Sequence, residues 1–258
     1  MADAPLNDPN PLHDTKTLTV QLTAAERERK WPNQLPRDAA TLILIDRTGK
    51  TPKILFGKRH HGLKFMAGKY VFPGGRIEAG DRRMAVAAPL SAIAEERLMK
   101  RIQRPSASRA RALALSAIRE TFEETGLVIG VKDHGAPEAP PPGVWSDFAR
   151  HGVFPSLDKM HFVARAITPP RRPKRFDTRF FAVDAEDVAA RVEGVVTPDS
   201  ELVELTWMSL ADAKSLDLPS ITRVIVQELE NRIAAGFSDR LPVPFYYERQ
   251  LKFQREEL

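Results

Sequence analysis

Three glutamates lie close together in the stretch RETFEETGLVIG, which runs from Arg119 to Gly130. On a helix of 3.6 residues per turn, the side chain of Glu120 neighbours those of Glu123 and Glu124. Like charges at this spacing destabilise a helix by roughly 0.2–0.5 kcal/mol a pair. Carboxylates in the last turn of a helix also oppose its dipole. The cluster is unfavourable by itself, so its presence calls for a reason.

Two interpretations of this cluster stay open at this point. In the first, the glutamates form a solvated helix face, where water screens the repulsion and Arg119 relieves part of it. In the second, they bind a divalent cation, because clustered carboxylate oxygens suit Mg²⁺ or Mn²⁺, which commonly bridge to substrate phosphates. The spacing of the glutamates does not choose between the two.

A glycine-rich segment upstream favours the cation site. The stretch FPGGRIEAGD spans residues 72–81 and lies between a predicted strand and the predicted helices. Adjacent glycines at 74 and 75 permit a sharp backbone path and a close approach to a ligand. A backbone carbonyl there is a candidate to complete the coordination of a metal.

Taken together, the two stretches resemble the signature motif, or box, of the Nudix hydrolases. Gly75 matches the opening glycine, and the second half of the box matches at Arg119, Glu120, Glu123, Glu124, Gly126 and Leu127. Asp81 stands where the family pattern has a glutamate, and Thr121 replaces the usual bulky residue. Residues 82–118 separate the two halves, where the family has a much shorter spacer. A box interrupted in this way is similar to that of the coenzyme A diphosphatases of the peroxisomal type and their bacterial relatives.

The resemblance implies a fold, an activity and a metal site. The fold expected is a Nudix-type α/β/α sandwich with a mixed sheet and a helical insertion. The activity expected is hydrolysis of a nucleoside-diphosphate-linked compound to two monophosphates, with coenzyme A or acyl-coenzyme A as the substrate and Mg²⁺ or Mn²⁺ as the cofactor. Glu120, Glu123 and Glu124 would hold the metal, with the Gly74 carbonyl as a further ligand, and Arg119 would orient one of the glutamates.

Residues outside the metal cluster complete the predicted site. The resemblance implies that the general base is either a box glutamate or a glutamate from a later segment. Glu204 is the later residue predicted to be catalytic, and Glu201, near the same strand, is equally suited. The residues predicted to contact substrate are Arg59, Gly75, Arg76 and Arg175. The guanidinium groups among them suit phosphate oxygens, although Arg175 belongs to the run RRPKR, which a solvated loop would equally explain.

Alternation and helical periodicity predict the elements that must position these residues. Strands are expected at 41–46, 53–59, 69–75, 159–168, 178–183 and 201–210, and helices at 89–103, 110–122 and from 219 onward. Ser106 or Ser108 is expected to cap the helix that carries the glutamates, and Gly126 to end it. Intermixed strands and helices indicate an α/β fold. The predicted organisation is an N-terminal arm (1–37), one Nudix domain (38–237, with a helical insertion at about 82–114) and a C-terminal tail (238–258).

Composition narrows the function classes. The chain has 258 residues, no cysteine and 42% hydrophobic residues, so disulfides and thiolate metal sites are excluded and a real core is expected. No apolar run reaches the roughly 18 residues of a membrane helix, and a cytoplasmic protein is expected. The net charge is +5, yet no zinc-finger spacing or RNA-binding motif accompanies it, so a small phosphate-bearing ligand is favoured over nucleic acid. The aromatic tail allows a homodimer.

Two alternatives to coenzyme A hydrolysis remain open. The box recognises a diphosphate that ADP-ribose and nucleotide sugars share with coenzyme A, so either is an alternative substrate. The chain is alternatively a Nudix-fold nucleotide-binding protein without catalysis. The intact glutamate cluster argues against that second alternative, because a protein that only binds has little reason to keep repulsive charges.

Overall fold

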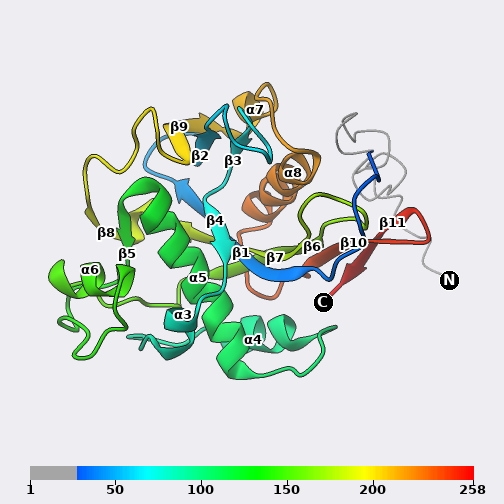
Figure 1. Ribbon diagram of the computed structural model, residues 1–258. Helices are drawn as coiled ribbons and strands as arrows, with labels where there is room; N and C mark the ends of the chain where they lie inside the picture. The colour runs from blue at the N-terminus through cyan, green and yellow to red at the C-terminus, as the bar shows by residue number, and fades with distance from the viewer. Residues whose placement is uncertain (1–27) are drawn as a thin grey trace, which may run out of the picture.

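The computed structural model describes residues 28–258 (Figure 1), and its centre is a mixed β-sheet. Among these residues, nine strands join in one sheet of order β11-β10-β6-β7-β1-β2-β3, with β4 also paired to β1 and β9 to β2. The strands are β1 (Arg37–Asp46), β2 (Lys53–Arg59), β3 (Tyr70–Val71), β4 (Gly74–Arg76), β6 (His161–Ile167), β7 (Phe176–Asp184), β9 (Leu202–Ser209), β10 (Pro244–Arg249) and β11 (Lys252–Glu257). A separate pair consists of β5 (Leu127–Ile129) and β8 (Val188–Arg191).

Strand β1 shows why the sheet is buried on both faces. Successive side chains of a strand point to opposite faces. Leu42 and Leu44 belong to one hydrophobic cluster, and Ile43 and Ile45 to the other. Strand β1 runs parallel to β7, with Leu42 opposite Phe181. A strand covered on both faces is expected to read as a continuous apolar run, which explains the sequence TLILI.

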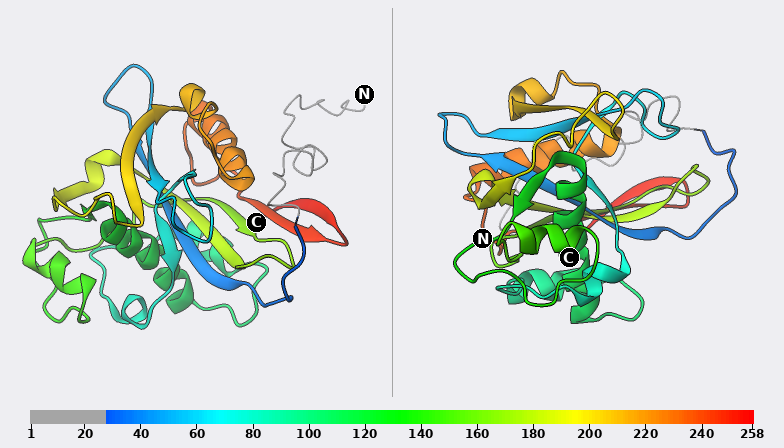
Figure 2. Two further views of the ribbon diagram at one scale, coloured as in Figure 1. Left: turned by 45° about the horizontal axis from the view of Figure 1, so that its top comes forward. Right: turned by 60° about the vertical axis from the view of Figure 1, so that its left-hand side comes forward.

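Helices cover the two faces of the sheet. Helix α5 (Ala107–Thr125) packs on the face of Leu42, and α8 (Ser220–Ala234) packs on the face of Ile43. Figures 1 and 2 show these two helices on opposite sides of the strands. The other helices are α3 (Ala79–Arg83), α4 (Ala92–Met99), α6 (Val144–Arg150), α7 (Leu210–Ala213) and the short 3₁₀ turn η1 (Ala185–Asp187). The predicted α/β class with a mixed sheet is therefore confirmed.

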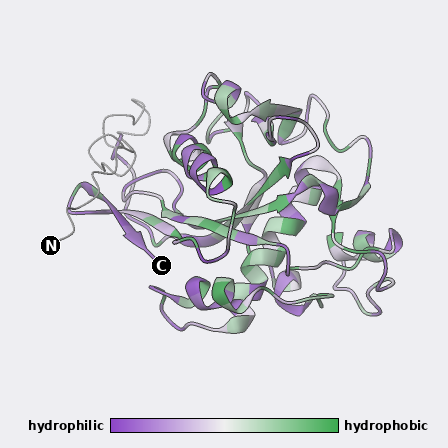
Figure 3. Ribbon diagram, turned by 180° about the vertical axis from the view of Figure 1, so that it is seen from behind, coloured by the Kyte–Doolittle hydropathy of each residue, from purple (hydrophilic) through white to green (hydrophobic). Residues whose placement is uncertain are grey.

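Two predicted segments differ from what the structure shows. Gly74 and Gly75 do not end a strand but form β4, and they pair with Thr41 and Ala40 of β1. The C-terminal segment is not a separate tail, because β10 runs parallel to β6 and β11 completes a hairpin with β10. Figure 3 shows this hairpin as mainly hydrophilic beside the mainly hydrophobic central strands. Its aromatic residue Tyr246 is nevertheless buried in the domain's own core.

The insertion within the box is part of the domain core. Leu90, Ala94 and Leu98, on and just before α4, are buried in the same cluster as α5. Arg165 of β6 donates to the carbonyls of Lys100 and Arg101, at 3.1 and 3.2 Å. These hydrogen bonds join the chain after α4 to the central sheet, so the insertion has a fixed place beside α5.

The predicted N-terminal arm lies partly outside the described residues, because only residues 28–37 of it are described. Arg29 makes a two-point ion pair with Glu248 of β10, at 2.9 and 2.5 Å. No helix within residues 28–258 has the length and apolar character needed to cross a membrane.

Candidate functional site

The predicted box glutamates lie at the C-terminal end of α5. Ser106 caps the start of the helix by accepting a hydrogen bond from the backbone N–H of Arg109 at 3.2 Å. Gly126 ends it in the left-handed conformation, with φ of 75°, and its N–H donates to Phe122 O at 2.8 Å. Glycine adopts this conformation without steric cost. Both ends of the helix are therefore set by local sequence, as predicted.

The glutamate face of α5 is not a solvated surface. The side chain of Arg119 is 3% exposed and Glu124 is 9% exposed as a residue, whereas Glu123 is exposed. Buried carboxylates are rare unless they are paired or hydrogen-bonded. The interpretation of this end as an ordinary exposed helix face is therefore wrong for Arg119 and Glu124.

The two glycines of β4 let the glutamates approach the backbone closely. A Cβ atom on Gly75 would lie 2.2 Å from the Cδ of Glu120, and one on Gly74 would lie 2.5 Å from the Ala40 carbonyl oxygen. The N–H of Gly74 also donates to Glu124 Oε2 at 3.1 Å. The glycines are required here because two carboxylates and strand β1 occupy the space of any side chain.

Asp81 anchors Arg119. Its carboxylate accepts from Arg119 Nε at 2.9 Å and from a terminal nitrogen of Arg119 at 3.2 Å. It also accepts from the backbone N–H of Glu78 at 2.7 Å and from the indole nitrogen of Trp145 at 3.2 Å. Asp81 is fully buried, and four donors compensate the cost of burying its charge. The sequence pattern does not point to Trp145, because this residue lies in α6, outside the box.

Arg119 in turn holds two of the glutamates. One terminal nitrogen donates to Glu120 Oε1 at 3.0 Å and to Glu123 Oε2 at 2.7 Å. The other donates to the Arg76 carbonyl at 2.6 Å. One guanidinium therefore joins the glycine loop to the glutamate helix.

Burial gives the three glutamates raised pKa values. Burial raises the pKa of Glu120 to about 7, against the opposing effect of Arg119, and the charge of Glu123 adds to the rise. The pKa of Glu123 is raised as well by the part of its side chain that is buried, although 37% of that side chain is exposed. Glu124 has a pKa well above its ordinary value, because burial and the charges of Glu201 and Glu120 outweigh the Gly74 N–H. A divalent cation would offset this accumulated negative charge.

The chemistry of these donors fits Mg²⁺ or Mn²⁺, but the side chains are not gathered around a point. Among residues 28–258, no three His, Cys, Asp or Glu side chains converge closely enough to hold a metal ion. Arg119 turns Glu120 and Glu123 toward itself, and Glu124 turns toward the Gly74 N–H. Carboxylate oxygens are nevertheless the ligands that these cations prefer. The three glutamates lie within five residues of α5, so changes of side-chain rotamer would suffice to turn their carboxylates toward one ion.

Arg59 and Glu201 lie beside this cluster. A terminal nitrogen of Arg59 donates to Glu201 Oε1 at 2.8 Å, and Arg59 Nε donates to the Phe65 carbonyl at 3.2 Å. The charges of both Glu201 and Arg59 influence the pKa of Glu124. The structure therefore places Arg59 and Glu201 next to the carboxylate cluster. Glu201 is the alternative to Glu204 as general base.

The side chains of the other predicted site residues make different contacts. Glu204 is near Lys58 Nζ, at 3.7 Å, and accepts from the Tyr70 hydroxyl at 3.4 Å. Arg175 donates to the carbonyls of Thr168 and Gln34, at 3.0 and 2.6 Å, so it binds the N-terminal arm. Arg76 joins the cluster through its backbone carbonyl, and its side chain is exposed.

Nudix proteins are among the solved structures that are similar to this chain. Over 81% of this chain and 86% of the other, the protein is 25% identical to a Nudix hydrolase from Alicyclobacillus acidocaldarius, with a TM-score of 0.51. A MutT protein from Methanosarcina mazei Go1 is 16% identical over 78% of this chain and 99% of its own, with a TM-score of 0.41. The Nudix domain of Shewanella oneidensis NrtR, solved with ADP-ribose, is 12% identical over 78% and 90%, with a TM-score of 0.42.

A search of protein-family models gave no match, and a search of curated proteins gave none either. Of the three structures, the first is similar enough to bear on the fold of this chain. The fold agrees with that structure over most of both chains, and Gly75, Arg119 and the three glutamates occupy the box positions. The chain therefore has a fold similar to that Nudix hydrolase and carries the residues of the Nudix box.

Proposed function

We propose that the protein hydrolyses a nucleoside-diphosphate-linked compound, most specifically coenzyme A or an acyl-coenzyme A, to two monophosphates. The observation that carries this proposal is the buried cluster in which Arg119 holds Glu120 and Glu123 beside the Gly74–Gly75 backbone. Such a cluster of carboxylates with raised pKa values is costly for the fold alone. That cost favours a role in binding cation and phosphate.

Glu120, Glu123 and Glu124 would hold Mg²⁺ or Mn²⁺, with the Gly74 carbonyl as a further candidate ligand. When bound, such a cation neutralises diphosphate oxygens and lowers the pKa of a coordinated water. Arg119 and its anchor Asp81 keep the helix and the glycine loop in register. The backbone at Gly75 leaves space for phosphate oxygens, since a side chain there is excluded.

In the proposed reaction, water attacks one phosphorus atom and the bridging P–O bond breaks. Glu201 is the first candidate to accept the proton of the attacking water, because its charge already acts on Glu124. Arg59 would leave its ion pair with Glu201 to bind a phosphate oxygen, since an arginine fork suits phosphate. Glu204, whose carboxylate lies near Lys58 and Tyr70, is the second candidate base.

Coenzyme A as the substrate is supported by the interrupted box and by the sequence resemblance to that branch. The test is a panel of coenzyme A, an acyl-coenzyme A, ADP-ribose and a nucleotide sugar with Mg²⁺ or Mn²⁺, read as phosphate-bearing products. We expect coenzyme A or its acyl ester to give 3′,5′-ADP and the matching phosphopantetheine. Cleavage of ADP-ribose alone would overturn the substrate assignment but not the activity.

The metal assignment is tested by Glu123→Gln, which changes an exposed residue and should leave the fold intact. We expect turnover to fall by at least roughly 10–100-fold, the range seen when groups around a metal site are altered. Glu193→Gln is the control, because the side chain of Glu193 is 79% exposed and pairs with Arg191 at 3.0 Å. A folded Glu123→Gln variant with undiminished turnover would overturn the assignment.

A further inference from the structure

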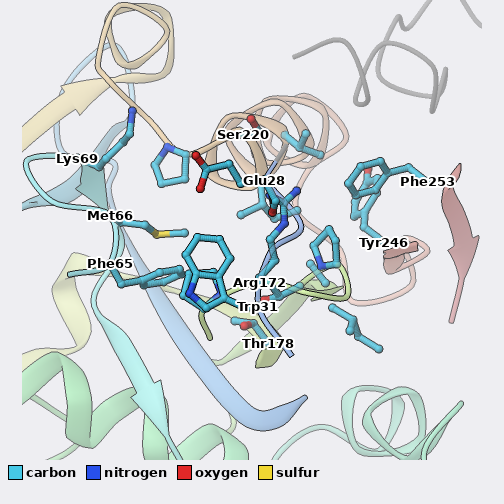
Figure 4. A pocket seen from close by; sticks show the side chains of 18 of the residues that line it. Glu28, Trp31, Phe65, Met66, Lys69, Arg172, Thr178, Ser220, Tyr246 and Phe253 are labelled. Atoms are coloured by element: carbon cyan, nitrogen blue, oxygen red, sulfur yellow. Dashed lines mark hydrogen bonds between the residues drawn. The ribbon is translucent and has the colours of Figure 1, made fainter. Parts of the chain in front are cut away.

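A largely apolar pocket lies on the face of the sheet opposite the box helix. It has a volume of about 550 Å³ and is formed by β6, β7, the start of α8, the loop between β2 and β3, and the C-terminal hairpin. Figure 4 shows it from close by. Its apolar lining includes Phe65, Met66, Phe180, Ile221, Val224 and Phe253. Ligand pockets in proteins have volumes of roughly 300–1,000 Å³ and largely apolar linings.

Several charged groups at the rim of this pocket have partners within the protein, whereas Lys64 at the same rim is exposed. Lys69 Nζ is 2.6 Å from Asp217 Oδ1, and Arg172 donates to the Glu28 carbonyl at 3.0 Å. The hydroxyl of Tyr246, which also lines the pocket, donates to Glu228. These pairings leave the pocket mainly with carbon surface to offer, which favours an apolar guest over a heterocyclic base that needs hydrogen bonds.

The N-terminal arm forms the outer wall of the pocket. Trp31 lines it, and Figure 4 shows its indole gathered with Phe65 and Met66 at one side. The arm is fixed on both sides of Trp31. Arg29 forms the two-point ion pair with Glu248, and Gln34 donates from Nε2 to the Pro173 carbonyl at 3.0 Å. The basic run that contains Arg175 therefore holds the arm over the pocket.

One loop connects the pocket to the carboxylate cluster. No box glutamate lines the pocket. Phe65, however, contributes its side chain to the lining, while its carbonyl accepts from Arg59, the partner of Glu201. A substrate held at the carboxylates thus has the pocket on the other side of residues 60–69.

From this geometry we propose that the pocket binds a linear acyl chain, and that Trp31 is a specificity-determining residue that closes it. The pocket is a binding site in its own right. It is joined to the proposed function in one respect: an acyl group carried by the diphosphate substrate would occupy it. The inference extends that function by assigning the apolar part of the substrate to named residues.

The test uses neutral probes that lack phosphate, namely saturated acyl thioesters of N-acetylcysteamine with chains of four to twelve carbons. Binding is measured by isothermal titration calorimetry without metal. Each buried methylene contributes about 0.8 kcal/mol, so affinity should rise about fourfold per methylene until the pocket is full. Affinity that is independent of chain length, or tighter binding of adenosine than of the eight-carbon ester, would overturn the proposal.

Two variants and one control locate the binding. Trp31→Ala should weaken the eight-carbon ester about tenfold, and Leu35→Ala should not change it, because Leu35 lies on the same arm but is 87% exposed and outside the lining. Thr178→Phe fills the pocket from β7 and should abolish binding of long chains while the short ones still bind. Unchanged long-chain binding in folded Thr178→Phe would place the chain elsewhere and refute the proposal.

The outcomes separate this inference from the proposed function. Loss of chain-length dependence together with Mg²⁺-dependent diphosphate cleavage refutes the acyl pocket alone. Chain-length-dependent binding without any cleavage supports the pocket and refutes the proposed hydrolysis. For turnover of acyl-coenzyme A, Trp31→Ala should raise KM and leave kcat unchanged, because lost uniform binding appears in KM.

Discussion

At the scale of single residues, the site depends on how closely carboxylates approach the backbone. Glu120 packs against the α-carbon of Gly75, and Glu124 accepts from the Gly74 N–H. Arg119 pairs with both Glu120 and Glu123. The position of each carboxylate therefore depends on the absence of a side chain in β4 and on one guanidinium.

Gly75→Ala tests the close approach. The new methyl group would lie 2.2–2.4 Å from the carboxylate atoms of Glu120, which is the flexible end of a side chain. We expect the protein to fold with Glu120 displaced, and stabilisation of the protein by Mg²⁺ to be lost in a thermal melt. Gly49→Ala is the control, because its nearest neighbouring atom is 3.8 Å from the added Cβ. Equal stabilisation of both variants by Mg²⁺ would contradict this account.

The raised pKa values predict how stability varies with pH in the absence of metal. The folded-state pKa values of Glu120 and Glu124 lie above the ordinary value of 4.5, and that of Glu120 is about 7. Between about pH 4.5 and 7 the folded state therefore binds more protons than the unfolded state, so these groups lower stability as pH rises through this window.

Glu124→Gln removes one of these penalties and should raise the metal-free melting temperature at pH 7.5. The same variant should lose the stabilisation that Mg²⁺ gives the wild type, because a carboxylate ligand is gone. Differential scanning calorimetry with and without Mg²⁺ measures both effects. A lower melting temperature for metal-free Glu124→Gln would show that the charged carboxylate stabilises the fold.

At the scale of elements, the short helix α3 fastens the glycine loop to α5. Asp81, in α3, accepts four hydrogen bonds, two of them from Arg119. The family pattern has a glutamate at this position, but the aspartate here is fully buried against Trp145. The shorter side chain therefore fits the distance between α3 and α5.

Asp81→Asn should destabilise the protein by roughly 3–5 kcal/mol, since it leaves Arg119 as a buried charge without its main partner. Asp81→Glu should destabilise it by roughly 1–3 kcal/mol, because an added methylene overpacks a filled site. Urea unfolding measures both. A glutamate variant as stable as the wild type would mean that the site has spare room and that the fit argument fails.

The elements were predictable from sequence to different degrees. Helix α5 was predictable, because its apolar residues recur at helical spacing and because Ser106 and Gly126 mark its ends. Strand β4 was not, since a Pro-Gly-Gly run ordinarily signals a break and only the neighbouring β1 makes it a strand. The sequence of the aromatic C-terminal segment did not show which surface would cover it. Its pairing with β6 is a long-range contact that the local sequence pattern does not encode.

At the scale of the whole molecule, much of the basic charge is engaged inside the fold. Arg165 pairs with Asp177 at 2.8 and 2.7 Å, and Arg109 pairs with Asp38 at 2.7 and 2.8 Å. These pairs surround the place where the insertion meets the sheet, since Arg109 also donates to the Gln103 carbonyl at 2.9 Å. Arginines near the insertion and in the run RRPKR thus hold the insertion and the arm in place.

Arg165→Met should destabilise the whole domain, because it leaves the buried carboxylate of Asp177 without its two-point partner and frees the chain after α4. We expect a loss of roughly 3–5 kcal/mol in unfolding free energy, with one cooperative transition. Arg150→Met is the control, since Arg150 is 72% exposed and pairs with Asp147 on the surface. A separate early transition for the insertion would contradict its assignment to the common core.

The site as a whole was predictable only in part, for a physical reason. The resemblance placed Gly75, Arg119 and the three glutamates at box positions, and the fold brings them together. The roles of Asp81, Trp145 and the Arg59–Glu201 pair depend on packing between distant segments. Arg175 was predicted to contact substrate, but it binds the protein's own N-terminal arm. A basic run next to a strand has the same sequence pattern in both cases.

The central claim is that the glutamate cluster supports metal-dependent hydrolysis of a diphosphate. The most direct measurement is reaction of coenzyme A in ¹⁸O-labelled water with Mg²⁺, followed by mass spectrometry of the products. The account predicts two monophosphates, one of which carries the label, with no cleavage by metal-free protein and a strongly reduced rate for Glu123→Gln. Undiminished labelled cleavage by metal-free protein or by Glu123→Gln, or no cleavage of any diphosphate in the panel, would contradict it.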